Sequence, residues 1–206
     1  MGPRIKLGIL VLALGLVPGM AMAEPPEDYW KRTGAYTGLT GFYAFGQAFQ
    51  DEVTDSLRAV GAPASTSTRG SGGLSFYGGY RYASWGAVDV SYDWVDNMTW
   101  NVAGLTFDYA THSWAVNGKF YLPMWRFQPY LNLGFGTQYA DLGFTSNADS
   151  TSWGILGRPG AGFDFWINRN LVLKAEVMGF LPTNAMGFGT NNLYYMTAGG
   201  GIEYHF

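Results

Sequence analysis

The sequence predicts an all-β protein, an eight-stranded antiparallel up-and-down β-barrel that crosses a membrane. Apolar residues alternate with polar or small residues in segments that recur along the chain. Charged residues make up only 13 % of the chain, against about 25 % in ordinary soluble domains, whereas aromatic residues make up 17 %. Mean hydropathy is only −0.02. In a membrane barrel the lipid-facing and lumen-facing residues alternate and average out, which explains this combination.

The first 23 residues are predicted to be a secretory signal peptide. Arg4 and Lys6 precede an apolar run over residues 7–17, and Ala21-Met22-Ala23 is a small-residue cleavage pattern. The run is shorter than the about 20 apolar residues that a transmembrane helix needs. We therefore expect a removed signal peptide (residues 1–23), a periplasmic N-terminal segment (24–33) and an outer-membrane β-barrel domain (34–206).

The last predicted strand shows the alternation most clearly. From Tyr194 to Phe206, one face carries Met196, Ile202 and Tyr204 and the other carries small or polar residues. Six further segments alternate in the same way, over residues 74–82, 88–94, 114–121, 130–136, 160–165 and 171–178. Residues 36–49 form the remaining strand, whose two faces the pattern does not assign.

The connections between these strands alternate in length. Short ones are predicted near residues 83–86, 123–126 and 168–170, and long ones near 50–72, 95–106, 140–152 and 181–192. Short turns on one rim and long loops on the other are typical of outer-membrane barrels. Ten strands are the alternative, if the long loop that contains Trp100 and Phe107 forms a hairpin of its own.

The apolar face is predicted to face lipid. The opposite face is rich in glycine and carries too few charges for a solvated surface, and the apolar face holds more large aromatics than a narrow barrel interior accommodates. Tryptophan and tyrosine are enriched at both membrane interfaces of such proteins. The predicted aromatic girdles comprise Trp94, Trp114, Trp153 and Tyr194 at the loop rim, and Tyr82, Trp85, Trp125 and Trp166 at the turn rim.

The polar face is predicted to line the lumen. If two of the short turns are centred on Trp85 and Arg169, Arg81 lies opposite Asp89 and Asp164 lies opposite Lys174. Opposite charges directly across two strands contribute roughly 0.2–1 kcal/mol each. We therefore predict interior ion pairs Arg81–Asp89 and Asp164–Lys174. The other predicted polar residues of the lumen are Asp93, Lys119, Glu176 and Glu203.

Several segments resemble the opacity-type, outer-membrane-protein-A-like group of small barrels. The resembling segments are Gly79-Tyr80-Arg81-Tyr82 with Ala87-Val88-Asp89-Val90, residues 119–123 with 126–130, Gly160-Ala161-Gly162-Phe163, and residues 202–206. The resemblance covers nearly all of the chain after the signal peptide. It implies a barrel in the cell outer membrane, inserted by the barrel-assembly machinery, with Phe206 as the terminal aromatic assembly signal. The group has diverse functions, so the resemblance implies no activity.

The composition argues against several function classes. The chain has a formal net charge of −3 and no basic stripe, so nucleic acid is not an expected partner. It has no cysteine and only two histidines, which gives no convincing metal site. Asp51, Glu52 and Asp55 are interpreted as a solvated acidic loop. No cofactor is expected.

His112 next to Ser113 raises the alternative of a lipid A-modifying enzyme. A nucleophilic serine needs a base within hydrogen-bonding reach. Neighbouring residues of a strand point to opposite faces, so His112 is a poor base for Ser113. We therefore predict that the protein is not an enzyme, and we interpret His205 as an interior hydrogen-bonding residue.

The predicted function is that of a structural and surface-interaction barrel whose lumen is filled by side chains. The first alternative is a narrow channel, or a lateral route for small hydrophobic molecules like that of the outer-membrane-protein-W group; the lipid A-modifying enzyme ranks below it. The expected partners are outer-membrane lipid and lipopolysaccharide, the barrel-assembly machinery during biogenesis, and a surface ligand bound through the loops.

Overall fold

The computed structural model describes residues 29–45, 66–102, 105–144, 150–183 and 194–206. It contains one short 3-10 helix, η1 (Tyr29–Lys31), and strands β1 (Gly34–Phe45), β2 (Thr66–Arg69), β3 (Ser71–Ala83), β4 (Gly86–Val102), β5 (Leu105–Tyr121), β6 (Phe127–Phe144), β7 (Ser150–Trp166), β8 (Leu171–Thr183) and β9 (Tyr195–His205). No helix within these ranges is long and apolar enough to cross a membrane. The predicted signal peptide lies outside the described residues.

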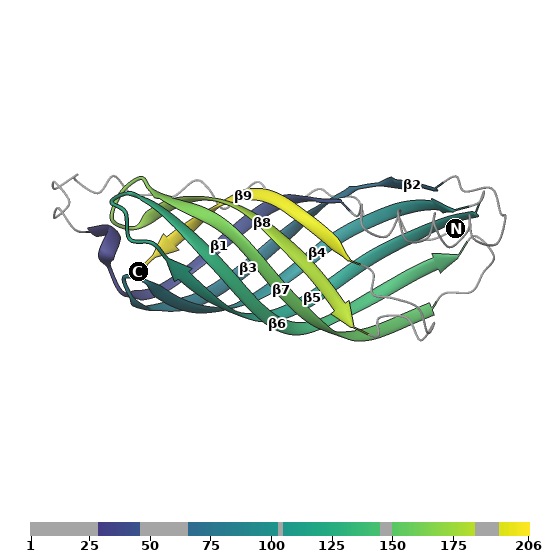
Figure 1. Ribbon diagram of the computed structural model, residues 1–206, viewed down its shortest axis with the longest axis horizontal. Helices are drawn as coiled ribbons and strands as arrows, with labels where there is room; N and C mark the ends of the chain where they lie inside the picture. The colour runs from purple at the N-terminus through teal and green to yellow at the C-terminus, as the bar shows by residue number, and fades with distance from the viewer. Residues whose placement is uncertain (1–28, 46–65, 103–104, 145–149, 184–193) are drawn as a thin grey trace.

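The strands form a closed antiparallel barrel (Figure 1). Each strand from β3 to β9 pairs with its neighbour in sequence, and β1 pairs with both β3 and β9, which closes the ring. β2 continues the line of β3 beyond Gly70 and pairs with the same partner, β4, so it does not add a wall strand. The predicted eight-stranded up-and-down barrel is therefore confirmed.

The strands on one side of the barrel are longer than predicted. β4 and β5 stay paired to their ends, and Trp100 lies opposite Phe107 there. The predicted loop is therefore an extension of the β4–β5 hairpin and adds no further strands. β6 likewise reaches Phe144 and β7 begins at Ser150. The loops predicted at 95–106 and 140–152 were thus too long, and the ten-strand alternative was wrong. Figure 1 shows β4–β7 running past the ends of β8 and β9 at the rim opposite the C-terminus.

Burial follows the predicted alternation of faces. On β5 the outward Trp114, Val116 and Phe120 are 57 %, 54 % and 46 % exposed, whereas Asn117 and Lys119 between them are buried. Such a continuous apolar outer surface is expected only against lipid. The structure also assigns the two faces of β1, which the sequence pattern left open. Its inward residues include Tyr36, Thr40, Phe42 and Ala44.

The predicted aromatic girdles need one correction, at Trp166. Tyr82, Trp85, Trp125, Trp114 and Trp153 are exposed on the outer wall, and Trp94 and Tyr194 are half-buried. Trp166, however, is 0 % exposed and lies inside the barrel against Val172 and Trp30. The physical reason is parity, since Trp166 is two residues beyond the inward Asp164 and shares its face.

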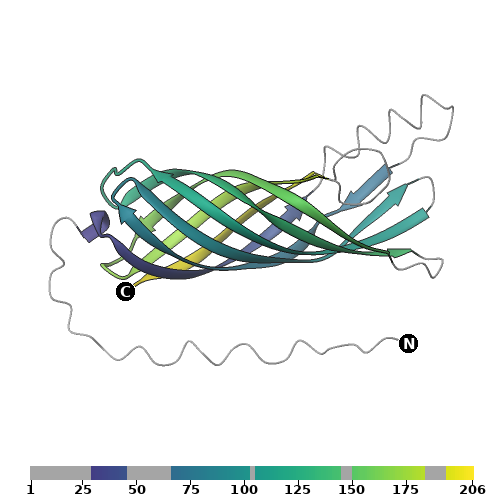
Figure 2. The same cartoon turned by 90° about the horizontal axis from the view of Figure 1, so that it is seen from below.

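The N-terminal segment covers the turn rim of the barrel. The ring of Trp30, in η1, lies edge-on to Trp125 with centroids 6.5 Å apart. The Gln128 side chain donates a hydrogen bond of 2.8 Å from Nε2 to the Trp30 carbonyl oxygen. Figure 2 shows the short helix at the same end of the barrel as the C-terminus. This end is therefore closed by Trp30, Gln128 and Trp166.

Closure between β1 and β9 depends on an inward glycine. A Cβ atom on Gly201 would collide with the backbone oxygen of Leu39 and lie 2.7 Å from Thr40 Oγ1. Gly41 lies on the outward face of β1 at the same seam. A Cβ atom added there would have only Leu74 Cδ2 near it, at 4.0 Å. The two glycines form a matched pair with opposite steric tolerance.

We expect Gly201→Val to destabilise the barrel by about 1–3 kcal/mol, the usual cost of overpacking. The measurement is urea unfolding of the refolded barrel, together with the heat-dependent mobility shift on a denaturing gel. Gly41→Val is the control and should leave both nearly unchanged. Equal stability of the two variants would contradict the assigned seam.

Candidate functional site: the barrel lumen

A network of charged side chains fills the central and turn-side part of the lumen. Its members come from six strands and have almost no solvent exposure: Arg81, Asp89, Asp93, Lys119, Arg158, Asp164, Lys174, Glu176 and Glu203. Buried charges at such density are stable only when they are paired or hydrogen-bonded. The network is therefore the chemically distinctive part of this barrel.

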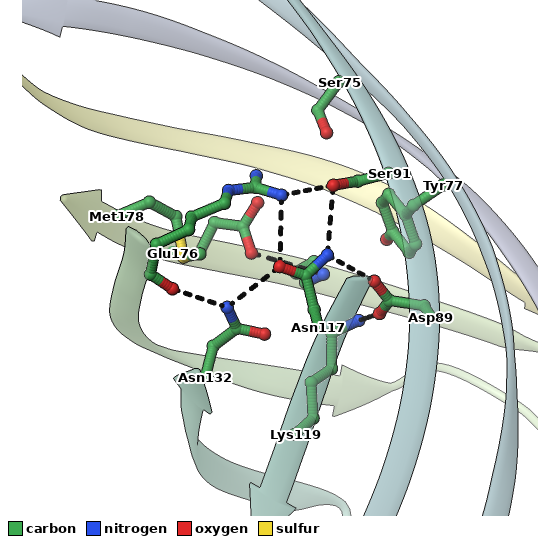
Figure 3. Close-up of a pocket in the computed structure, with 11 residues that line it drawn as sticks. Ser75, Tyr77, Asp89, Ser91, Asn117, Lys119, Asn132, Glu176 and Met178 are labelled. Carbon is green, nitrogen blue, oxygen red and sulfur yellow. Dashed lines mark hydrogen bonds and ion pairs between the residues drawn. The ribbon is translucent and has the colours of Figure 1, made fainter. Parts of the chain in front are cut away.

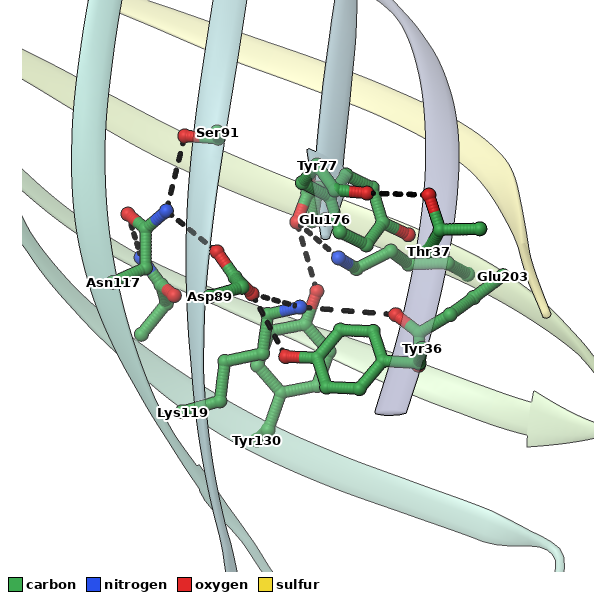
Figure 4. Close-up of polar contacts among 12 residues, drawn as sticks. Tyr36, Thr37, Tyr77, Asp89, Ser91, Asn117, Lys119, Tyr130, Glu176 and Glu203 are labelled. Atoms are coloured by element: carbon green, nitrogen blue, oxygen red, sulfur yellow. Dashed lines mark hydrogen bonds and ion pairs between the residues drawn. The ribbon is translucent and has the colours of Figure 1, made fainter. Parts of the chain in front are cut away.

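Lys119 lies at the centre of the turn-side half of this network (Figure 4). Its Nζ atom is 2.7 Å from Asp89 Oδ2 on β4 and 3.8 Å from Glu203 Oε2 on β9. Tyr36 donates a hydrogen bond of 2.9 Å to Asp89 Oδ2, and Nζ lies 4.6 Å from the centre of the Tyr77 ring. Since three strands separate β5 from β9 in either direction around the ring, Lys119 connects opposite walls.

Arg158 makes a second connection across the lumen. It extends from β7 to β4, where Nη2 donates a hydrogen bond of 2.9 Å to Asp93 Oδ1 and Nη1 donates to Ser91 Oγ. Asn117 lies between the two cationic groups and donates to Asp89 Oδ1 at 2.7 Å and to Ser91 Oγ at 3.0 Å (Figure 3). The two connections thus form one continuous network.

The predicted Arg81–Asp89 ion pair was wrong. The turn is centred between Ser84 and Trp85, where Ala83 pairs with Gly86, and a one-residue irregularity between Arg81 and Ala83 shifts the ladder further. Asp89 therefore lies opposite Gly79, and Arg81 lies opposite Ala87. Arg81 instead donates a hydrogen bond of 2.8 Å from Nη2 to Gln128 Oε1 and places its guanidinium 4.4 Å from the centre of the Tyr121 ring.

For the second predicted ion pair, Asp164–Lys174, the register is confirmed but the ion pair is not. Asp164 does lie opposite Lys174. The Lys174 ammonium, however, forms its ion pair with Glu176, at 3.3 Å from Oε2, and the same oxygen accepts a 2.9 Å hydrogen bond from Tyr130. Within the described part of the chain, Asp164 Oδ1 has no hydrogen-bond partner. Asp93, Lys119, Glu176 and Glu203 all face the lumen.

Arg158 is the main residue that the sequence reasoning missed. It lies at an even interval from Asp164, which the sequence analysis assigned to the lumen, within the same alternating strand. Extending this alternation by two residues would have placed Arg158 inside as well. Asn117 shares the inner face of β5 with Lys119, but its bridging role depends on neighbours from β4 and β6.

Side chains leave almost no free space in this network. The space that a water-sized molecule can reach among Ser75, Ser91, Asn132 and the charged groups is about 10 Å³. This is about the volume that a single water molecule needs. The lumen at this level is therefore filled by protein, as expected for eight strands.

The loop-side half of the lumen has a different character. The buried side chains there are mostly apolar: Phe42, Ala44, Val95, Met98, Leu156, Phe180 and Tyr195. The rings of Phe180 and Tyr195 are stacked, with centroids 4.5 Å apart and planes at 11°. Uncharged polar side chains lie among these apolar residues, namely Thr111, Ser113, Gln138 and Thr197, so the interior changes from charged to uncharged along the barrel axis.

His112 and Ser113 lie on opposite sides of the wall. Ser113 is buried in the lumen, whereas the half-buried His112 is on the outer face with Nδ1 2.7 Å from the Tyr92 hydroxyl. His205 faces the lumen, with Nε2 2.7 Å from Glu203 Oε1. Among the described residues, no three potential metal ligands are grouped to hold an ion. Asp51, Glu52 and Asp55 lie outside those residues.

A closed eight-stranded barrel with an apolar outer wall and a charged, filled interior defines a small integral outer-membrane barrel. The model of one protein family, described as the outer membrane protein beta-barrel domain, matches residues 9–206. The chain therefore belongs to this family, and its location is the outer membrane.

Solved structures show the same fold. Neisserial surface protein A has a TM-score of 0.60 at 14 % identity, with 84 % of this chain and 97 % of that chain covered. The N-terminal barrel domain of OprF from Pseudomonas aeruginosa gives 0.53 at 14 % identity, covering 85 % and 100 %. OprG from the same organism gives 0.51 at 17 % identity, covering 86 % and 98 %. No curated protein matches the sequence.

We expect Lys119→Met to destabilise the barrel by about 3–5 kcal/mol, because Asp89 and Glu203 would keep their buried charges without the shared cation. Urea unfolding of the refolded protein measures this change. Arg169→Met, at the exposed turn before β8, is the control and should change stability by less than about 0.5 kcal/mol.

A double variant separates the ion pair from the packing of the lysine stem. Adding Asp89→Asn to Lys119→Met removes one of the two stranded charges, so the double change should cost less than the sum of the single changes. Additive effects would mean that Lys119 acts through packing alone.

Proposed function

We propose that this protein is a non-porin barrel with a structural role in the outer membrane and a surface-interaction role at its loop rim. The observation that carries the proposal is the pair of cross-lumen connections, from Lys119 to Asp89 and Glu203 and from Arg158 to Asp93 and Ser91. A continuous water path would have to break both connections.

The energy needed to open the lumen supports a closed ground state. Removing one partner of a buried ion pair costs about 3–5 kcal/mol in proteins. Even about 3 kcal/mol corresponds to an open population below roughly one per cent. A transient channel would therefore need a loop movement or a ligand that provides new partners for these charges.

The surface role is supported by strand length. A transmembrane strand needs about 9–11 residues, whereas β5 has 17 and β6 has 18. The excess places the loop-side ends of β4–β7 outside the bilayer, where their paired strands offer a continuous sheet to a surface ligand. The partners we propose are outer-membrane lipid, lipopolysaccharide, and the barrel-assembly machinery, which would read the outward Phe206. We propose no catalytic role, because His112 and Ser113 cannot act together across the wall.

We expect the refolded wild-type barrel to be electrically silent in a planar lipid bilayer. The double change Lys119→Ser/Arg158→Ser should produce small, reproducible openings, because it removes both cations that connect opposite walls in a lumen with almost no spare volume. Arg169→Ser, at the exposed turn before β8, is the matched control and should stay silent. Steady openings of the folded wild-type protein would overturn the filled-lumen proposal in favour of a narrow channel.

A lateral route for small hydrophobic molecules is the second candidate, and a local break in the wall favours it. The ladder between β7 and β8 pairs Gly157 with Leu181 and resumes only at Gly160 with Met178. Pro159 lies in this gap and has no N–H to donate. The gap adjoins Phe180, at the boundary between the uncharged and the charged parts of the lumen.

Cross-strand disulfides test the lateral route. If hydrophobic molecules pass there, cells that produce the barrel should take up a fluorescent naphthylamine faster than cells without it. Oxidised Gly157→Cys/Leu181→Cys should abolish the gain and reduction should restore it. Ala161→Cys/Val177→Cys, on the intact ladder, is the control and should have little effect. Equal uptake with and without the wild-type barrel would exclude this route.

A further inference from the structure

The outer wall carries a groove near the loop rim that a simple lipid-facing surface does not require. It is lined by Tyr92 on β4, His112 and Trp114 on β5, Thr137 and Tyr139 on β6, and Trp153 on β7. Its volume is about 420 Å³. The groove therefore spans four adjacent strands of the outer face.

Aromatic rings form the sides of the groove. Tyr92 and Trp114 lie with their centroids 4.8 Å apart, and Tyr139 meets the edge of Trp153 at 5.5 Å. Trp114 is 57 % and Trp153 66 % exposed, so both offer open ring surface. Rings held by such contacts keep their orientation and can stack against a flat ligand.

The groove lies just inside the outer edge of the apolar band, a few residues below the level where acyl chains meet the lipid headgroups. His112 is eight positions from Phe120, which pairs with Gly86 beside the turn-rim Trp85. A tilted strand gains roughly 2.5 Å of height per residue, so His112 lies about 20 Å from the turn-rim girdle. The apolar band of such a barrel is about 25 Å tall. The groove is therefore open to molecules of the outer leaflet.

The groove also contains polar atoms on an otherwise apolar wall. The Tyr92 hydroxyl and His112 Nδ1 are 2.7 Å apart, so this contact leaves Nε2 of His112 open for another bond. Thr137 is exposed and adds a hydroxyl. Below the groove the outward residues of the same strands are Val116, Leu133 and Phe135. No lysine, arginine, aspartate or glutamate is among the six lining residues.

We propose that this groove binds a glycolipid of the outer leaflet at the junction of its sugar and acyl chains. A sugar ring presents a C–H face that packs on tryptophan or tyrosine rings, and its hydroxyls match His112 Nε2 and the Thr137 hydroxyl. The acyl chains would continue along the aliphatic wall. The uncharged lining fits a sugar better than a phosphate. The proposal depends on the outer-membrane location and not on a filled lumen.

The test uses native mass spectrometry of the folded barrel in detergent. The probes are a lipopolysaccharide trimmed to lipid A and inner-core sugars, and phosphatidylglycerol. His112→Phe and Trp153→Leu should each weaken glycolipid retention about fivefold, the factor for roughly 1 kcal/mol. The matched controls at the turn rim are Tyr82→Phe and Trp85→Leu, which should retain it as the wild type does. The heat-dependent gel shift checks that every variant is folded.

Two outcomes would overturn the proposal. One is equal glycolipid retention by the groove variants and the turn-rim controls. The other is displacement of the glycolipid by an equal concentration of phosphatidylglycerol, which would mean that the groove takes any lipid. Selective loss in the groove variants alone would support it. None of these results depends on the conductance of the lumen.

Discussion

A backbone N–H or C=O group without a partner costs several kcal/mol in hydrocarbon, and this constraint forces the sheet of this protein to close on itself. The antiparallel pairing of β1 with β9 completes the ring of eight wall strands. Closure with so few strands leaves an interior just wide enough for side chains. Glycines such as Gly201 make the close approach of strands possible where a Cβ would collide with the neighbouring backbone.

The narrow interior in turn dictates the chemistry of the lumen. Charged side chains that point inward have little water available, so they must satisfy one another. Lys119 and Arg158 do so by reaching strands that are not their neighbours, which connects the walls more broadly than the strand ladders alone. The ladder is interrupted where Pro159 lies beside Arg158. The wall thus has one of its interruptions next to a connection that closes the lumen.

The outer wall is not uniform either. On β4–β7 the loop-side surface carries aromatic rings with a histidine and a hydroxyl among them, whereas β8 and β9 present Val177, Leu181 and Met196. The same four strands extend beyond β8 and β9. An outer-leaflet lipid and a surface ligand would therefore meet the barrel on the same side.

The sequence by itself determined the fold class, the two faces of seven strands and the identity of most lumen residues, because alternation is a local property of a strand. It would also have placed Trp166 and Arg158 inside had the alternation been followed two residues further. Only the tertiary structure decided which charges meet. Lys119 is 84 positions from Glu203 in sequence, and the two approach each other because closure places β5 and β9 on opposite walls of a narrow lumen. The turn irregularity that separates Arg81 from Asp89 likewise arises from pairing geometry, which no local pattern encodes.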